Sequence, residues 1–281
     1  MKIAINAWTF PKNYSIPQGM RIAKRAGFDG IELNISEDEY LTPDTPDADV
    51  EKFKELAQNI SLEIFTVSSG LWWNYPLTSP DKKIAEHGMY LVRKGLYIAR
   101  LLGAETLLVV PGMVTPEVSY DAAYERALAA LKTLAEDAKR EGVIIGVENV
   151  WNKFLLSPLE ARGFIDAVGS PFVRFYLDVG NLLAYGYPEQ WIKILGSRIT
   201  AVHVKDFHAN IGNWNGFTNP MQGDVNWIAV RNALREIDYN GPITAEIPGY
   251  KTLPDLGIKH AGESLKRIFK SASASRRDSS L

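Results

Sequence analysis

The most constraining feature of this sequence is a regular alternation of short apolar segments with longer amphipathic ones. Eight runs have the length of buried parallel strands, are rich in β-branched residues and mostly lack polar alternation. They cover residues 2–6, 30–34, 63–67, 106–110, 144–148, 174–178, 201–205 and 243–247. Strands of this composition are buried on both faces, so the pattern predicts a parallel sheet with helices packed on it.

The segments between these runs show the apolar spacing of helices. Gly27, Gly103 and Gly142 follow three of them, at the position where a glycine often ends a helix. Ser157 and Pro158 open another with an N-cap and a first-turn proline. The predicted helices cover residues 18–26, 48–58, 81–102, 119–140, 188–195, 227–237 and 263–269, and one more begins at Ser157.

Eight strands that alternate with eight helices favour an α/β fold of the closed (β/α)8 TIM-barrel type. An open doubly wound sheet is the alternative, but no glycine-rich phosphate-binding turn follows the first predicted strand. The length of 281 residues suits one barrel. We therefore expect a single catalytic domain over residues 1–270 and, because residues 271–281 are small and polar, a disordered tail.

Composition excludes several classes of site and partner. The chain has no cysteine, which rules out disulfides, thiolate metal sites and cysteine nucleophiles. A net charge of −2 gives no electrostatic footprint for nucleic acid or an anionic membrane. The sequence shows neither a signal-peptide pattern nor an apolar run long enough to span a bilayer, so we expect a cytoplasmic protein.

Four polar residues fall at or near the ends of the fifth to eighth predicted strands. They are Glu148, Asp178, His203 and Glu246. Catalytic groups of a barrel lie at the carboxyl ends of its strands, and these strands are consecutive neighbours, so the side chains can converge. Three carboxylates and one imidazole suit a divalent ion, Mn²⁺ first, with Mg²⁺, Co²⁺ or Zn²⁺ as alternatives. A structural ion-pair network is the competing interpretation.

Polar and aromatic residues in the adjoining loops are candidates for substrate contacts. Aromatic rings stack on the C–H faces of sugars, which favours a small carbohydrate as the ligand, whereas loop packing or a subunit interface would explain the same rings. Asn181 could equally cap a turn, and Lys205 could form a surface salt bridge. The substrate-binding candidates are Trp8, Trp73, Asn149, Trp151, Asn181, Lys205 and His208.

Six motifs resemble those of the xylose isomerase-like barrel superfamily of sugar and sugar-phosphate isomerases and epimerases. They are GFDGIEL (27–33), GVEN (146–149), YLDVGN (176–181), AVHVKD (201–206), GDVNW (223–227) and GPITAE (241–246). The resemblance spans nearly the whole chain and is closest to the L-ribulose-5-phosphate 3-epimerases, also known as hexulose-6-phosphate isomerases. It implies metal ligands at Glu148, Asp178, His203 and Glu246, and catalytic roles for Glu148 and Glu246.

The resemblance implies a metal-dependent epimerase or isomerase that moves a proton next to a carbonyl through an enediolate, most simply in ketose 3-epimerisation. A lyase acting on a keto-inositol or 3-keto-glycoside would use the same site. A metal-dependent nuclease and a non-catalytic sugar-binding barrel are the other classes considered. A homo-oligomer, dimer or tetramer, is expected by analogy alone.

Phosphorylation of the substrate stays open at this point. Residues 71–75 carry no basic side chain, although phosphate-using relatives have His or Arg in this loop. Free-ketose enzymes, in turn, usually have His where this chain has Asn181. Neither substrate class fits the sequence completely.

Overall fold

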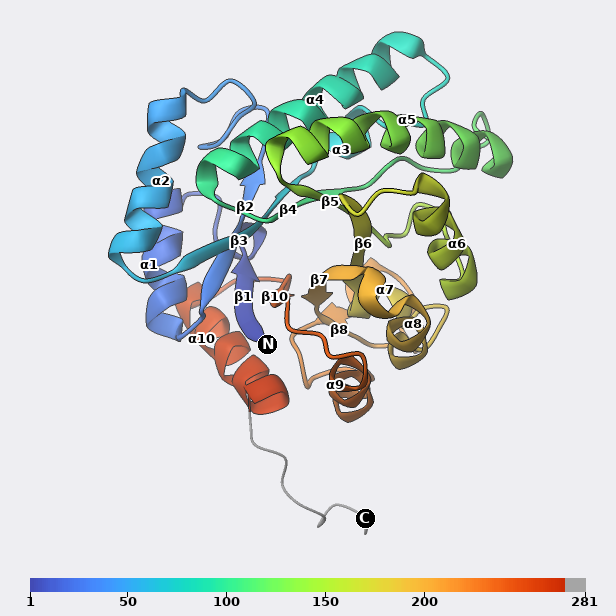
Figure 1. Ribbon diagram of the computed structural model, residues 1–281. Helices are drawn as coiled ribbons and strands as arrows, with labels where there is room; N and C mark the ends of the chain where they lie inside the picture. Colours follow the sequence, from blue (N-terminus) through green and yellow to red (C-terminus); the bar gives the residue numbers. More distant parts are fainter. Residues whose placement is uncertain (271–281) are drawn as a thin grey trace.

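The computed structural model describes residues 1–270 of the chain, and the predicted tail lies outside the described residues. Eight parallel strands form a closed barrel in the order β1-β10-β7-β6-β5-β4-β3-β2, surrounded by helices (Figure 1). The barrel strands are β1 (Lys2–Asn6), β2 (Gly30–Ile35), β3 (Glu63–Ser69), β4 (Thr106–Val109), β5 (Ile144–Glu148), β6 (Val173–Asp178), β7 (Ile199–Val204) and β10 (Pro242–Ala245). The predicted (β/α)8 fold is confirmed.

The outer layer consists of one principal helix after each strand. These helices are α1 (Ile16–Ala26), α2 (Asp47–Asn59), α4 (Lys82–Leu102), α5 (Tyr120–Glu141), α6 (Pro158–Val168), α8 (Pro188–Leu195), α9 (Trp227–Glu236) and α10 (Pro254–Leu265). Ser15 and Ser157 cap the starts of α1 and α6 through their side chains. Gly27, Gly103 and Gly142, all in the left-handed conformation, end α1, α4 and α5.

One predicted helix was placed wrongly. We expected residues 263–269, but α10 begins nine residues earlier at Pro254 and passes into a π-helical turn at Lys266–Lys270. Leu253 precedes it in the left-handed conformation, and no side chain caps the helix start. The start therefore lacks the capping signal that marked other helices.

Several short elements at the carboxyl ends of the strands were not predicted. They are a 3₁₀ turn (Ala7–Thr9), α3 (Leu71–Asn74), α7 (Val179–Leu182), a second 3₁₀ turn (Trp214–Gly216) and the two-stranded sheet β8 (Asp206–Phe207) and β9 (Phe217–Thr218). A further 3₁₀ turn, Gly196–Arg198, precedes β7. Elements this short carry too few residues for a periodic pattern.

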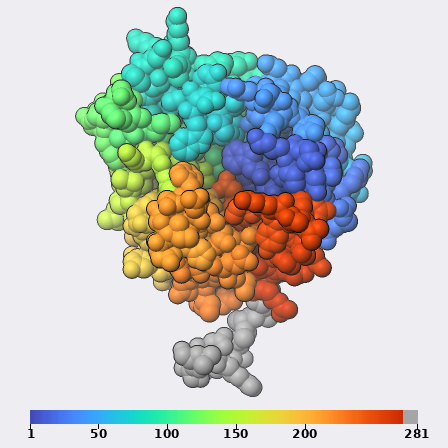
Figure 2. Space-filling view, turned by 180° about the vertical axis from the view of Figure 1, so that it is seen from behind, coloured from blue at the N-terminus to red at the C-terminus, as the bar shows by residue number. Residues whose placement is uncertain are grey.

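The barrel closes where its first and last strands pair. β1 aligns with β10 over Lys2–Pro242 to Ile5–Ala245. The blue N-terminal and red C-terminal parts of the chain therefore lie against each other (Figure 2). Among the described helices, none combines the length and apolarity needed to cross a bilayer.

Candidate active site

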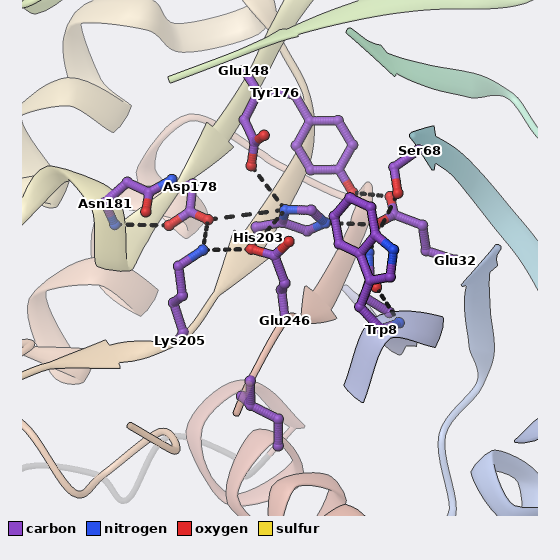
Figure 3. A network of polar contacts seen from close by, with 12 residues as sticks. Trp8, Glu32, Ser68, Glu148, Tyr176, Asp178, Asn181, His203, Lys205 and Glu246 are labelled. Carbon is purple, nitrogen blue, oxygen red and sulfur yellow. Dashed lines mark hydrogen bonds and ion pairs between the residues drawn. The ribbon is translucent and has the colours of Figure 1, made fainter. Parts of the chain in front are cut away.

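The predicted metal ligands come together at the carboxyl ends of adjacent strands (Figure 3). Glu148 ends β5, Asp178 ends β6, His203 lies in β7 and Glu246 follows β10. One potential ligand atom from each of the four residues lies within 4.8 Å of all the others. The fold thus gathers side chains that are almost one hundred residues apart in the sequence.

His203 lies at the centre of this group and is completely buried. Its Nδ1 atom lies 2.9 Å from Glu148 Oε1 and 3.7 Å from Glu246 Oε2. Its Nε2 atom donates to Glu32 Oε1 at 2.7 Å. Burial opposes the charged imidazole, but the carboxylates of Glu32 and Glu246 outweigh it and raise the pKa of His203 well above its ordinary value.

Glu32 was not among the predicted site residues. It is fully buried in β2, and each of its oxygens has two donors. Oε1 accepts from Asn6 and His203, whereas Oε2 accepts from the hydroxyls of Thr66, at 2.5 Å, and Tyr176, at 2.8 Å. Burial alone would raise the pKa of Glu32, but His203 and these hydroxyls hold it below the ordinary value. The sequence signal that could have identified Glu32 is an acidic residue between Ile31 and Leu33 inside a predicted strand.

Lys205 is the second basic residue among these side chains and is only 7% exposed. Its Nζ atom donates to Asp178 Oδ2 and to Glu246 Oε2. Burial opposes the ammonium charge, yet Asp178 and Glu246 raise the pKa of Lys205 above its ordinary value. The predicted candidate therefore lies among the candidate metal ligands and is not a surface ion pair.

The two predicted asparagines form hydrogen bonds between the ends of β5 and β6. Asn149 Nδ2 donates to the carbonyl of Asp178, and Asn149 Oδ1 accepts from the Asp178 backbone N–H. Asn181 Nδ2 donates to the Asn149 carbonyl, while the Asn181 N–H is held by Asp178 Oδ1 at 2.8 Å. The last of these contacts orients the Asp178 carboxylate, and the others hold the backbone at the ends of β5 and β6 together. Whether either asparagine also contacts a substrate stays a prediction.

The predicted tryptophans divide between two sides of the barrel. Trp151 donates from Nε1 to the Asn181 carbonyl and packs against Trp214 and Phe217. Trp8 follows β1 and is 45% exposed, and Trp73 lies in α3 and is 38% exposed. Figure 3 shows Trp8 on the β1 side of the cluster. Both exposed rings have free surface for a ligand, and their roles stay predictions.

His208 stands apart from these residues. Its backbone N–H donates to the Gly216 carbonyl in the β8–β9 region, and within residues 1–270 its side chain makes no hydrogen bond to the cluster. This region is organised by the fully buried Asp206, which accepts from the N–H groups of Met221 and Val225 and from Trp227 Nε1. The backbone N–H of Phe207 is a fourth donor to Asp206.

The donor set suits a divalent ion. Glu32, Glu148, Asp178 and Glu246 place four carboxylic acids around one histidine and one lysine. Burial raises the pKa of Glu148 to about 7, and the charges of Glu246 and Asp178 act in the same direction. A cation that brought two further positive charges would relieve this repulsion, and three carboxylates with one imidazole are ligands of Mn²⁺, Mg²⁺ and Zn²⁺.

A family model for the xylose isomerase-like TIM barrel matches residues 20–268. This chain belongs to that family. The putative L-ribulose-5-phosphate 3-epimerase SgbU of Escherichia coli (strain K12) is 26% identical over 251 residues, which are 84% of this chain and 85% of the relative. The L-ribulose 3-epimerase of Methylomonas sp. (strain DH-1) is 30% identical over 233 residues, 80% of this chain and 75% of the relative.

The solved structures agree with the family in fold. The IOLI protein, solved with a binding zinc atom, superimposes with a TM-score of 0.83 at 20% identity, covering 97% of this chain and 100% of that one. The family expected from the six motifs is thus confirmed, and so is the expected branch among its relatives. The predicted enzyme class is confirmed too, because the curated relatives of this family member are epimerases, which are carbohydrate isomerases.

Proposed function

We propose that this protein is a divalent-metal-dependent ketose 3-epimerase. The observation that carries the proposal is the convergence of Glu148, Asp178, His203 and Glu246 within 4.8 Å in a member of a barrel family whose relatives include two ketose 3-epimerases. Asp178 and His203 serve as ligands, while Glu148 and Glu246 serve both as ligands and as the proton-transferring groups. Mn²⁺ is the proposed ion, and a small carbohydrate is the proposed substrate.

The reaction needs a base on one face of C3 and an acid on the other. When bound, a divalent ion would polarise the ketose carbonyl and stabilise the negative charge of the enediolate. Glu148 and Glu246 come from strands that are separated by β6 and β7, so a substrate carbon between them presents opposite faces to the two carboxylates. One glutamate removes the C3 proton, and the other delivers a proton to the opposite face.

The remaining residues of the cluster prepare these two carboxylates. Lys205 holds Glu246 Oε2 at 2.5 Å, and His203 Nδ1 lies beside Glu148 Oε1. The four donors to Glu32 leave its carboxylate no freedom to rotate, so the imidazole of His203 is anchored from behind. The carboxylates are therefore oriented before the substrate arrives.

The test is proton exchange at C3. Protein loaded with Mn²⁺ is incubated with L-ribulose in heavy water and, in parallel, with L-ribulose 5-phosphate, and the products are identified by NMR. The 3-epimer should appear with deuterium at C3. Glu246→Gln should lose exchange by at least about 100-fold, the usual contribution of a positioned acid or base, and should still bind the ion. Absence of exchange with both ketoses, despite a bound ion, would refute the proposal.

A further inference from the structure

Asn34 has a polar atom that nothing in the described part of the chain satisfies. It lies near the end of β2 and is 9% exposed. Its Nδ2 atom donates to Ser68 Oγ at 2.5 Å, but its Oδ1 atom has no hydrogen-bond partner. A buried carbonyl oxygen without a donor has lost the hydrogen bond that water gives it in the unfolded chain, so this oxygen is a candidate acceptor for a donor from a ligand.

Asn34 is connected to His203, one of the proposed metal ligands, through a series of hydrogen bonds. His203 donates to Glu32, Asn6 donates to both Glu32 and Ser68, and Ser68 accepts from Asn34. Asn34 is two residues beyond Glu32 on β2, and the two pair with Ser68 and Thr66 of β3. Since side chains alternate along a strand, Asn34 shares the inward face of Glu32 and lies one step nearer the mouth, about 7 Å along the strand.

Trp8 covers this end of β2. The edge of its indole, Cζ2, lies 3.9 Å from the point where a Cβ atom added to Gly70, just after β3, would stand. Because β2 lies between β1 and β3, the ring extends from the end of β1 across the end of β2. Trp8 and Asn34 both line a cavity of about 110 Å³ between the loops that follow β1 and β2.

The charges near Asn34 are unsuited to an anion. Glu32 is a buried carboxylate on the same face of the same strand. Lys205 already holds Asp178 and Glu246. The charged residues of the cavity lining are Lys12 and Glu39, both exposed and of opposite sign. A phosphate dianion has only acceptors to offer to Asn34 Oδ1, whereas a hydroxyl can donate to it.

We propose that Asn34 Oδ1 accepts a hydrogen bond from the terminal hydroxyl of the ketose, beside the Trp8 ring, and that the site therefore selects unphosphorylated ketoses. This inference rests on the proposed epimerase function and adds the substrate class. The carbonyl end of the sugar lies at the metal cluster, and the other end extends across the mouth towards β2. A site built to bind a hydroxyl discriminates strongly against an analogue that lacks it.

The test combines two substrates with two proteins. Wild type and Asn34→Leu are compared on L-ribulose and on 5-deoxy-L-ribulose, which lacks the terminal hydroxyl, at saturating Mn²⁺. The variant should raise the KM for L-ribulose about 10-fold to 100-fold and leave the KM for the deoxy sugar within about twofold. Comparing variants on each sugar cancels the different ring equilibria of the two ketoses. Asn34→Asp keeps an acceptor and should retain activity on L-ribulose.

The rival explanation is a phosphate site at Lys12. Wild type should prefer L-ribulose to L-ribulose 5-phosphate by at least 10-fold in kcat/KM, and Lys12→Ala should leave that ratio unchanged. A preference for the phosphate that Lys12→Ala abolishes would overturn the inference. An equal loss of activity on L-ribulose and on 5-deoxy-L-ribulose in Asn34→Leu would also overturn it, because Asn34 would then have a structural role only.

Calorimetric binding separates this inference from the proposed function. If L-ribulose binds to wild type without turnover, and binds more weakly to Asn34→Leu, the epimerase proposal is wrong and the hydroxyl site is supported. If L-ribulose is turned over equally well by wild type and Asn34→Leu, the epimerase proposal is supported and the hydroxyl site is wrong. If neither turnover nor binding occurs with these sugars, both proposals fail.

Discussion

Glu32 should control how tightly His203 holds a divalent ion, although Glu32 is not a ligand itself. Its Oε1 atom accepts from His203 Nε2 at 2.7 Å, which leaves Nδ1 facing Glu148 and the ion position. Residues that orient a ligating histidine typically contribute 10-fold to 100-fold in metal affinity. Glu32→Leu removes the acceptor and should weaken ion binding by this factor, about 1.4–2.8 kcal/mol.

The geometry of Glu32 also predicts what a conservative change does. In Glu32→Gln the side-chain oxygen can occupy the Oε1 position and accept from Asn6 and His203. The amide NH₂ then faces Thr66 and Tyr176, whose hydroxyls can turn to accept. The glutamine variant should therefore recover most of the affinity that Glu32→Leu loses. Tyr176→Phe, which removes a donor to the other oxygen, is the matched control and should change the affinity by less than about threefold.

Titration of metal-free protein with Mn²⁺ in a calorimeter measures these affinities. In the Mg²⁺-loaded wild type, ¹⁵N-resolved NMR should find the proton of His203 on Nε2. A purely structural role for Glu32 would not determine which ring nitrogen carries this proton. The reasoning is wrong if a folded Glu32→Leu protein binds Mn²⁺ as tightly as wild type, or if the proton is found on Nδ1.

Three further changes test other parts of the site. Lys205→Met removes the buried cation between Asp178 and Glu246, so it should destabilise the metal-free protein by about 3–5 kcal/mol. Because Mn²⁺ then supplies the missing positive charge, the rise in Tm on adding Mn²⁺ should be larger than in wild type, and a smaller rise would contradict this. Because burial raises the pKa of Glu148 to about 7, protons compete with the ion at acidic pH, and Mn²⁺ affinity measured at pH 6 should be lower than at pH 8; equal affinities would exclude Glu148 as a ligand. Asp206→Asn weakens four hydrogen bonds that hold residues 206–227, so the free energy of unfolding should fall by about 2–3 kcal/mol and limited proteolysis should cut this region first. Asp224→Asn is the control, because it removes the charge of an exposed acid that accepts from Ala209; it should leave the proteolysis pattern unchanged.

The sequence was sufficient for the barrel and for the residues that converge at its mouth. Apolar runs such as 144–148 end in a single acid, and that acid must lie at a strand end if the run is a buried strand. The strand limits were accordingly predicted to within two residues. The ends of the strands follow from local patterns, and their circular order follows from the parallel βαβ connections of a closed barrel.

The contacts beneath and beside the cluster could not be predicted in the same way. Glu32 and Asn34 lie inside an apolar run, and their roles depend on Tyr176, Thr66 and Ser68, which come from other strands. Asn149 was expected near the site, but its hydrogen bonds to the Asp178 backbone depend on the register between β5 and β6. Cross-strand register is a property of the closed barrel, and no single segment encodes it.

The pairing of β1 with β10 has a consequence for how the protein is made. A ribosome delivers β1 first, and its partner along the closing seam, Lys2–Pro242 to Ile5–Ala245, emerges more than two hundred residues later. Glu246 follows directly behind that last strand. A nascent chain that stops before residue 242 carries Glu148, Asp178 and His203 but has neither a complete ring of strands nor Glu246, so the full set of proposed ligands is assembled only when the barrel closes.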